Sequence, residues 1–276
     1  MEDPLTDTPP PSRFFPEDLN NFSPPLPSIT SPSLSFSEPN TPHYPSLFIV
    51  AMSSPSLHLF HHISSKTLIG TLLIPEGSSK EKSKSCNIYA MNDGDGLVSV
   101  VSIEFVVPEE TCHAVAKLLI GDKIVPERVL LLDSIKSQNF RGRLSPDETF
   151  GFKLETVMQR LGGSMLKEIE YFPSGSMADG LAAALIARCQ MKKMKGTLCV
   201  TWPEHGGSAV SFVKSMIIKD VLPHLKIGVD GNLEGEYGRF AQIKSRQQHW
   251  ITCMWEHRIR AGEGGGRGEK VDRENV

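Results

Sequence analysis

The sequence predicts an α/β fold: a three-layer sandwich in which a mixed sheet is flanked by helices, preceded by a disordered N-terminal arm. Two observations support this prediction. Most segments between residues 46 and 135 are short apolar runs with strand character. Further along, 176–193 and 207–222 have apolar residues at helical spacing, and they enclose the strand-like run 196–203. Strands that alternate with helices favour a layered α/β domain, which we expect to span residues 46–228.

The first 45 residues hold twelve of the twenty prolines, together with many Ser, Thr and Asn residues. Proline lacks an amide donor and restricts the residue before it, so neither a helix nor a sheet propagates through such a stretch. We therefore expect residues 1–45 to form a disordered arm with polyproline character. At the other end, residues 229–276 are Gly-rich and lack periodicity, and we expect an irregular, disordered tail there.

The first half of the predicted domain has the pattern of a strand-rich meander with hairpins. The segments with strand character are 46–53, 57–60, 68–75, 86–92 and 97–107. An Asn-Asp-Gly sequence separates the last two, and it tolerates the positive φ angles of a tight turn. The polar segment 77–85 is expected to be an exposed loop.

The second half alternates helices with strands. Residues 108–121 begin with a proline and two glutamates and end at a glycine, which is a helical pattern, and 128–135 has the apolar character of a buried strand. The segment 136–173 is ambiguous, with a candidate helix over 153–161.

The clearest helix is 176–193, where Ser176 and Asp179 resemble a capping box and the basic end suits the helix dipole. A second amphipathic helix over 207–222 is ended by Pro223. Its predicted core face consists of Val210, Val213, Ile217 and Val221.

Charge and cysteine content exclude several classes of function. The formal net charge of −3 gives no overall attraction to nucleic acid or to an anionic membrane, so neither partner is expected. The five cysteines form no CxxC pair, and they are Cys86, Cys112, Cys189, Cys199 and Cys253. Cys112, Cys189 and Cys199 lie in apolar periodic segments, and we interpret them as buried packing residues; this cysteine usage suits a reducing compartment. The acidic, proline-rich start lacks the features of a secretory signal or transit peptide, so we expect cytoplasmic localisation, with the nucleus as an alternative.

Two fragments resemble parts of enzyme motifs, and neither motif is complete. The sequence from His205 to Ser208 is similar to the HGG oxyanion loop of some esterases, but the GxSxG elbow of that chemistry is absent. We interpret it as a strand-to-helix turn capped by Ser208. Ser174-Gly175-Ser176 opens a predicted helix as a phosphate cradle does, yet the Lys-Ser or Lys-Thr pair of a Walker motif is missing, so helix capping is the simpler interpretation.

Three groups of ligand-type residues match no defined metal spacing: Asp93 with Asp95, His58 with His61 and His62, and Cys253 with His257. The aspartates lie in a glycine turn and are expected to serve that turn. We assign the histidines to an exposed strand end and regard the last pair as incidental. The sequence therefore predicts no catalytic, cofactor-binding or metal-binding residue, no cofactor, and a role in binding other proteins.

Three segments resemble the proteasome assembly chaperone 1 family: 45–60, 129–135 and above all 179–204. In the last of these, a helix rich in small residues leads through a basic turn into an apolar strand. The resemblance covers residues 45–225. It implies an α/β sandwich similar to nucleoside-phosphorylase-like domains but without their activity.

The same resemblance implies a heterodimer with a second, related assembly chaperone. The pair holds proteasome α-subunits while the α-ring of the 20S core particle assembles. Members of the family commonly end in a hydrophobic-Tyr-X sequence that inserts between α-subunits. This chain ends in Glu274-Asn275-Val276, and its nearest tyrosine is Tyr237, so we expect docking by the tail to be weakened.

Two other functions remain open from the sequence. One is an enzyme of nucleoside-phosphorylase-like or hydrolase-like type, whose site would have to be assembled in three dimensions. The other is an interaction adaptor whose proline-rich arm recruits SH3 or WW modules.

Overall fold

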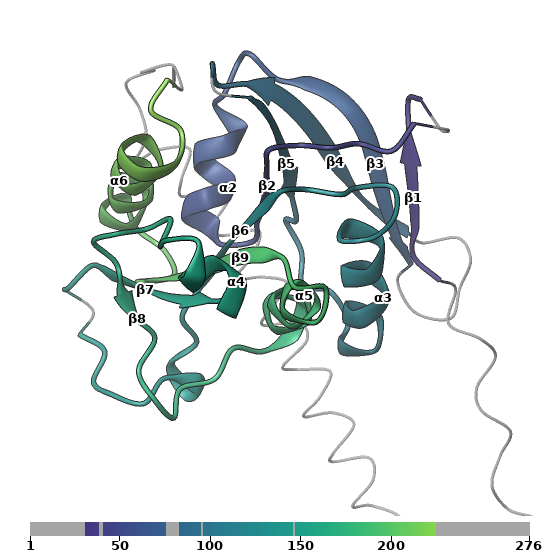
Figure 1. The fold of residues 1–276 in the computed structure, drawn as a ribbon. Coiled ribbons are helices and arrows are strands. Elements are labelled where there is room, and N and C mark those ends of the chain that lie inside the picture. Colours follow the sequence, from purple (N-terminus) through teal and green to yellow (C-terminus); the bar gives the residue numbers. More distant parts are fainter. Residues whose placement is uncertain (1–30, 39–40, 76–82, 95, 146, 225–276) are drawn as a thin grey trace, which may run out of the picture.

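The computed structural model describes residues 31–38, 41–75, 83–94, 96–145 and 147–224, which form one mixed sheet with helices on both faces (Figure 1). Within these residues the sheet has nine strands in the order β1-β3-β4-β5-β2-β6-β9-β7-β8. Their bounds are β1 (Ser33–Phe36), β2 (Leu47–Ala51), β3 (Thr67–Pro75), β4 (Ser83–Asn92), β5 (Leu97–Ser102), β6 (Arg128–Ser134), β7 (Phe150–Glu155), β8 (Glu170–Tyr171) and β9 (Lys195–Trp202).

Helices cover the two faces of this sheet in separate pairs, as Figure 1 shows. Their bounds are α2 (Ser54–His61), α3 (Glu109–Leu119), α4 (Val157–Leu161), α5 (Gly180–Met191) and α6 (Gly207–Met216), with a 3-10 turn η1 (Ser137–Asn139) and a π-helical turn η2 (Ile217–Val221). Helices α3 and α5 pack on one face, and α2 and α6 pack on the other. None of the helices in the described ranges is long and apolar enough to cross a membrane.

Strands β5, β2, β6 and β9 run parallel and form the middle of the sheet. An antiparallel meander, β1-β3-β4, continues the sheet beyond β5. On the other side, β7 is antiparallel to β9, and the short β8 is parallel to β7. The predicted three-layer α/β sandwich with a mixed sheet is therefore confirmed.

The central strands are buried on both faces, which explains their unbroken apolar sequences. In β2, Phe48 and Val50 contact the core beneath α3 and α5, whereas Leu47 and Ile49 contact the core beneath α2 and α6. Strand β6 alternates in the same way: one set of its apolar side chains enters each core. Parallel strands need a crossover connection, and helices provide the cover for both faces.

Most predicted elements are confirmed within one to a few residues. The segments 46–53, 68–75, 128–135 and 196–203 are strands, and 108–121 is a helix. The strand predicted over 97–107 ends at Ser102, and the start of β4 takes in the last residues of the polar segment 77–85. The helix predicted over 207–222 is α6 followed by the π-helical turn η2.

The strand predicted over 57–60 was wrong, because these residues belong to α2. The Ser53 hydroxyl accepts a hydrogen bond from the Ser56 amide at 3.3 Å, and Pro55 occupies the first turn. Both are signals of a helix start. A four-residue apolar run carries no usable period, so the start signal had to decide its type.

The expected disorder up to residue 45 was also wrong in part, because Ser33–Phe36 forms the edge strand β1. Leu34 is buried in the core and its carbonyl accepts a hydrogen bond from Lys123 Nζ at 3.2 Å. Pro32 stands just before the strand, where it interrupts no ladder. The expectations for residues 1–30 and 229–276 fall outside the described ranges and stay predictions.

The candidate helix over 153–161 divides into two elements at Thr156. Its first half is strand β7, paired with β9, and its second half is α4. The Thr156 hydroxyl accepts from the Gln159 amide at 3.3 Å and so caps the helix.

A polar network is buried where β7 and β8 meet the loop before β8. Lys153 and Glu155 are 4% and 5% exposed. Lys153 Nζ donates to Ser164 Oγ at 2.7 Å and to the Leu166 carbonyl at 2.6 Å. Glu155 accepts hydrogen bonds from Ser164 Oγ and from the Tyr171 hydroxyl, both at 2.7 Å. The hydrogen bond from Tyr171 to Glu155 is the main cause of the raised pKa of Tyr171. The network stabilises this end of the sheet, because each buried charge on β7 is hydrogen-bonded to the loop before β8 or to β8 itself.

Replacing Lys153 with Met should lower the free energy of unfolding by about 3 kcal/mol, because it removes the buried cation that is linked to the Glu155 carboxylate through Ser164 Oγ and that satisfies the Leu166 carbonyl. Urea unfolding of the full chain measures this change. The double variant K153M/E155L should recover a large part of the loss, since two apolar side chains then replace two charges. Equal stability of the single variant and the original protein would contradict a structural role for this network.

Candidate functional site: a crevice at the ends of the parallel strands

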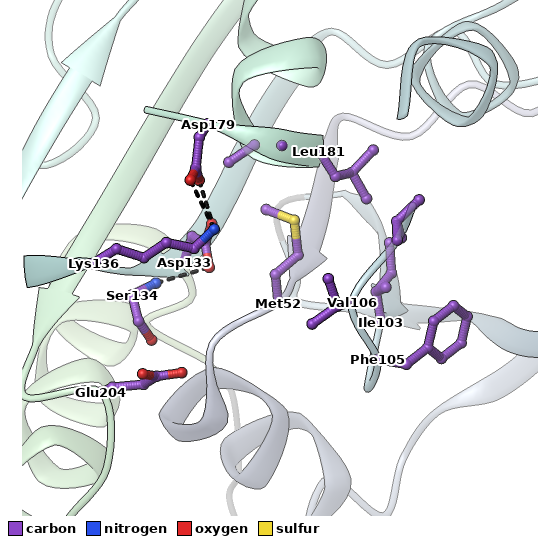
Figure 2. Close-up of a pocket in the computed structure, with 13 residues that line it drawn as sticks. Met52, Ile103, Phe105, Val106, Asp133, Ser134, Lys136, Asp179, Leu181 and Glu204 are labelled. Carbon is purple, nitrogen blue, oxygen red and sulfur yellow. Dashed lines mark hydrogen bonds and ion pairs between the residues drawn. The ribbon is translucent and has the colours of Figure 1, made fainter. Parts of the chain in front are cut away.

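A crevice lies where the parallel strands end, as in many open α/β sheets. Met52 follows β2, Ile103 follows β5, Asp133 and Ser134 end β6, and Glu204 follows β9. The first residues of α5 close it from the side (Figure 2). The cavity holds about 100 Å³.

One wall of the crevice is apolar. Met52, Ile103 and Leu181 are buried and line its inner part, and Figure 2 shows them together with Val106 on one side. Val106 is 45% exposed and stands at the mouth. This wall is suited to an aliphatic or aromatic side chain that enters from outside.

The opposite wall is polar and centres on Asp179. Lys136 Nζ forms an ion pair with its carboxylate at 2.8 Å, and Asn139 Nδ2 donates to it at 2.7 Å. Asp179 precedes α5, but its side chain makes no capping hydrogen bond, so the capping box predicted for Ser176 and Asp179 was wrong. The carboxylate is engaged by Lys136 and Asn139 instead of the first-turn amides.

The rim of the crevice carries more negative than positive charge. Carboxylates come from Asp133, Asp179 and Glu204, whereas Lys136 is the one cation among the described residues that line it. The Ser134 hydroxyl is buried without a hydrogen-bond partner in the described part, and Figure 2 shows its side chain directed toward the Glu204 carboxylate. A hydroxyl and several carboxylates favour a ligand that brings hydrogen-bond donors or a cation next to an apolar group.

The described lining includes neither histidine nor cysteine, and it brings no base within hydrogen-bond distance of Ser134. An apolar wall that faces an acidic one is suited to a ligand that carries an apolar group next to a cation or hydrogen-bond donors. The sequence analysis missed these residues because they are scattered along the chain. Their shared signal was position: most of them come directly after a buried strand.

The sequence matches no protein-family model and no curated protein. Several solved structures are nevertheless similar in fold. Pyrococcus furiosus PbaA, an archaeal homologue of proteasome-assembly chaperone, has a TM-score of 0.58 at 14% identity, covering 81% of this chain and 99% of PbaA. This chain shares its fold with a proteasome-assembly-chaperone homologue. The family resemblance in the sequence is thus confirmed at the level of the fold.

Two further structures share this chaperone-homologue fold. Pyrococcus furiosus PbaB, an archaeal proteasome activator, has a TM-score of 0.52 at 13% identity, covering 81% of this chain and 98% of PbaB. A Thermoplasma acidophilum protein of unknown function has a TM-score of 0.54 at 14% identity, covering 80% of this chain and 91% of its own.

Residues 205–208 form the predicted turn from β9 into the start of α6, but the capping roles predicted for the two fragments that resembled enzyme motifs were wrong. Gly206, with a φ of 129°, precedes α6, and no side chain caps this helix, so the capping role predicted for Ser208 was wrong. Ser174-Gly175-Ser176 lies before α5 and does not cap it. The Ser176 hydroxyl instead accepts from the Arg141 amide at 2.8 Å.

The ligand-type residues do not assemble into a metal site in the described ranges, where no group of three or more His, Cys, Asp or Glu residues is placed to hold an ion. The exposed strand end predicted for His58, His61 and His62 was wrong, because all three belong to α2 or directly follow it, and His58 is buried. Asp93 is buried in the turn after β4. Asp95, Cys253 and His257 lie outside the described residues.

The four cysteines in the described residues are buried and unbridged, which confirms the core assignment of Cys112, Cys189 and Cys199 and adds Cys86 to them. Burial raises the pKa of the thiols of Cys86, Cys189 and Cys199 to about 12 and that of Cys112 to about 11. Because the thiolate is the reactive form, none of these thiols is a nucleophile near neutral pH.

Iodoacetamide at pH 8 should therefore leave these four cysteines unmodified in the folded protein and modify all of them in guanidinium chloride. Peptide mass mapping distinguishes each site, so Cys253 is scored separately. As the pH rises above 9, the stability contributed by the protonated buried thiols falls, since each folded-state pKa lies above the unfolded value. Rapid labelling of Cys189 or Cys199 in the folded state at pH 8 would contradict the buried, protonated assignment.

Proposed function

We propose that this chain is a non-catalytic chaperone that forms a heterodimer with a related assembly chaperone and binds proteasome α-subunits while the α-ring assembles. The shared fold carries this proposal. The similarity to PbaA, an archaeal homologue of proteasome-assembly chaperone, extends over 99% of that chain, so it concerns a whole domain.

The location of the crevice supports the same proposal. The segments that carry the family resemblance, 45–60, 129–135 and 179–204, are far apart in the sequence. Each of them contributes residues to the crevice: Met52 from the first, Ser134 from the second, and Leu181 from the third. The resemblance therefore converges on one surface feature of the folded chain.

The chemistry of the crevice fits a ring subunit as its occupant. Subunits of a ring expose apolar side chains until their neighbours cover them, and such surfaces aggregate. An apolar wall next to an acidic rim accepts an apolar side chain that is flanked by Lys or Arg. We therefore propose that this crevice receives such a segment of a proteasome α-subunit.

Affinity purification of the full chain, co-expressed with proteasome α-subunits and a related assembly chaperone, should recover both partners. The V106D variant places a charge within the apolar wall at the mouth of the crevice, where the apolar side chain of the α-subunit would have to pack. We expect it to reduce recovery of α-subunits about tenfold, which corresponds to about 1.4 kcal/mol of binding free energy. Recovery of the related chaperone should stay unchanged.

The matched control is L68D, because Leu68 is 49% exposed on β3 and Val106 is 45% exposed. L68D should bind like the original protein. If the original protein recovers neither partner, the proposed function is wrong. If V106D and L68D both bind α-subunits fully, the function stands and the crevice is not the binding surface.

A further inference from the structure

A second surface lies at the opposite end of the parallel strands, at one corner of the sheet. It consists of exposed apolar side chains on β7, on α4 and at the end of α5, and we call it the α4 corner. Its members are Leu154, Val157, Met158, Leu161 and Met191. Leu161 is 78% exposed and Met191 is 61% exposed. These five are a large share of the twelve large hydrophobic residues that are exposed in the described part, so the exposure is concentrated here.

Helix α4 has the reverse of the usual pattern for a surface helix. It exposes Val157, Met158 and Leu161, while the polar Gln159 is 3% exposed. The Gln159 amide nitrogen donates to the Gly163 carbonyl at 2.7 Å. A helix on the surface of a globular protein normally turns its apolar side chains toward the core. The exposed apolar face of α4 is therefore one that another molecule would cover.

The α4 corner is fixed rigidly to the rest of the fold. The Val157 amide donates to Gln190 Oε1 at 3.0 Å, which joins the start of α4 to the end of α5. Thr156 Oγ1 donates to the Met194 carbonyl at 2.8 Å and accepts from the Gly196 amide at 3.0 Å. These bonds hold α4 against the start of β9, so its apolar side chains are displayed on a preformed surface.

Basic residues lie on or next to the elements that form this corner. They are Arg160 on α4 and Lys192, Lys193 and Lys195 in the segment between α5 and β9. Two of these lysines form ion pairs with acidic residues. Lys192 Nζ lies 4.0 Å from Asp122 Oδ1, and Lys195 Nζ lies 3.4 Å from Glu127 Oε1. Within the described residues, Arg160 and Lys193 have no such ion pair and stay available for a partner.

We propose that the α4 corner binds an acidic, amphipathic helical segment of another protein. Its apolar side chains would cover Met158 and Leu161, and its carboxylates would meet Arg160 and Lys193. The carboxylates of Asp122 and Glu127 among these basic residues favour a partner with locally matched charges over an anionic membrane, which offers negative charge alone. This inference does not depend on the proposed function.

The test uses the full chain and a fluorescent helical peptide about five turns long, with Leu on one face and Glu elsewhere. Fluorescence anisotropy should show saturable binding to the original protein. L161D should weaken binding at least about tenfold, because it places a carboxylate within the apolar contact. L68D, which changes an exposed leucine on the far part of the sheet, should bind like the original protein.

Charge reversal separates specific docking from nonspecific hydrophobic contact. The double variant R160E/K193E should lose the acidic peptide and gain affinity for a peptide with Lys in place of Glu, whereas K117E on α3 should change neither affinity. Absence of binding by the original protein, or equal binding by L161D, would overturn the proposal. Co-sedimentation with phosphatidylserine vesicles that L161D abolishes would also overturn it, by assigning the corner to a membrane.

Discussion

Burial of the adjacent strands β2 and β6 on both faces is the constraint on which the remaining structure depends. Their apolar side chains alternate between the α3–α5 core and the α2–α6 core, and most of them are fully buried. Both faces must then be covered by helices, because a parallel sheet with an exposed apolar face is unstable in water. With the faces covered, polar and binding groups have access only at the ends and edges of the strands. The crevice and the α4 corner occupy such positions.

The sequence predicted the elements whose burial or period was unambiguous. The segments that form β2, β6 and β9 are largely apolar. The segment that forms α3 begins with a proline and two glutamates and ends before a glycine, which is a clear helical pattern. The helix predicted over 153–161 was wrong in its first half, because this segment contains the end of a half-buried strand and a short helix, with the boundary at Thr156. Short elements carry too little periodicity for local sequence to decide, so tertiary pairing with β9 determined the result.

The candidate site was less accessible to sequence reasoning than the fold. Asp179 was interpreted as a helix cap. Its carboxylate is instead bound by Lys136, which lies 43 positions earlier in the sequence, and by Asn139, which lies 40 positions earlier. No local pattern contains such a contact, since it depends on how the strand ends converge. The absence of a complete catalytic motif was visible in the sequence, whereas the apolar wall of Met52, Ile103 and Leu181 required the folded chain.

The two ends of the parallel strands carry opposite charge, and this affects how the protein meets other molecules. The crevice has an excess of carboxylates, while Arg160 and three lysines lie on or next to the elements of the α4 corner. Strand β9, whose eight residues extend roughly 25 Å, connects the two regions. These two groups of charges contribute an electric dipole component directed along β9. A charged partner would therefore rotate the protein before contact, and this electrostatic steering would select which end it meets first and would weaken as salt is added.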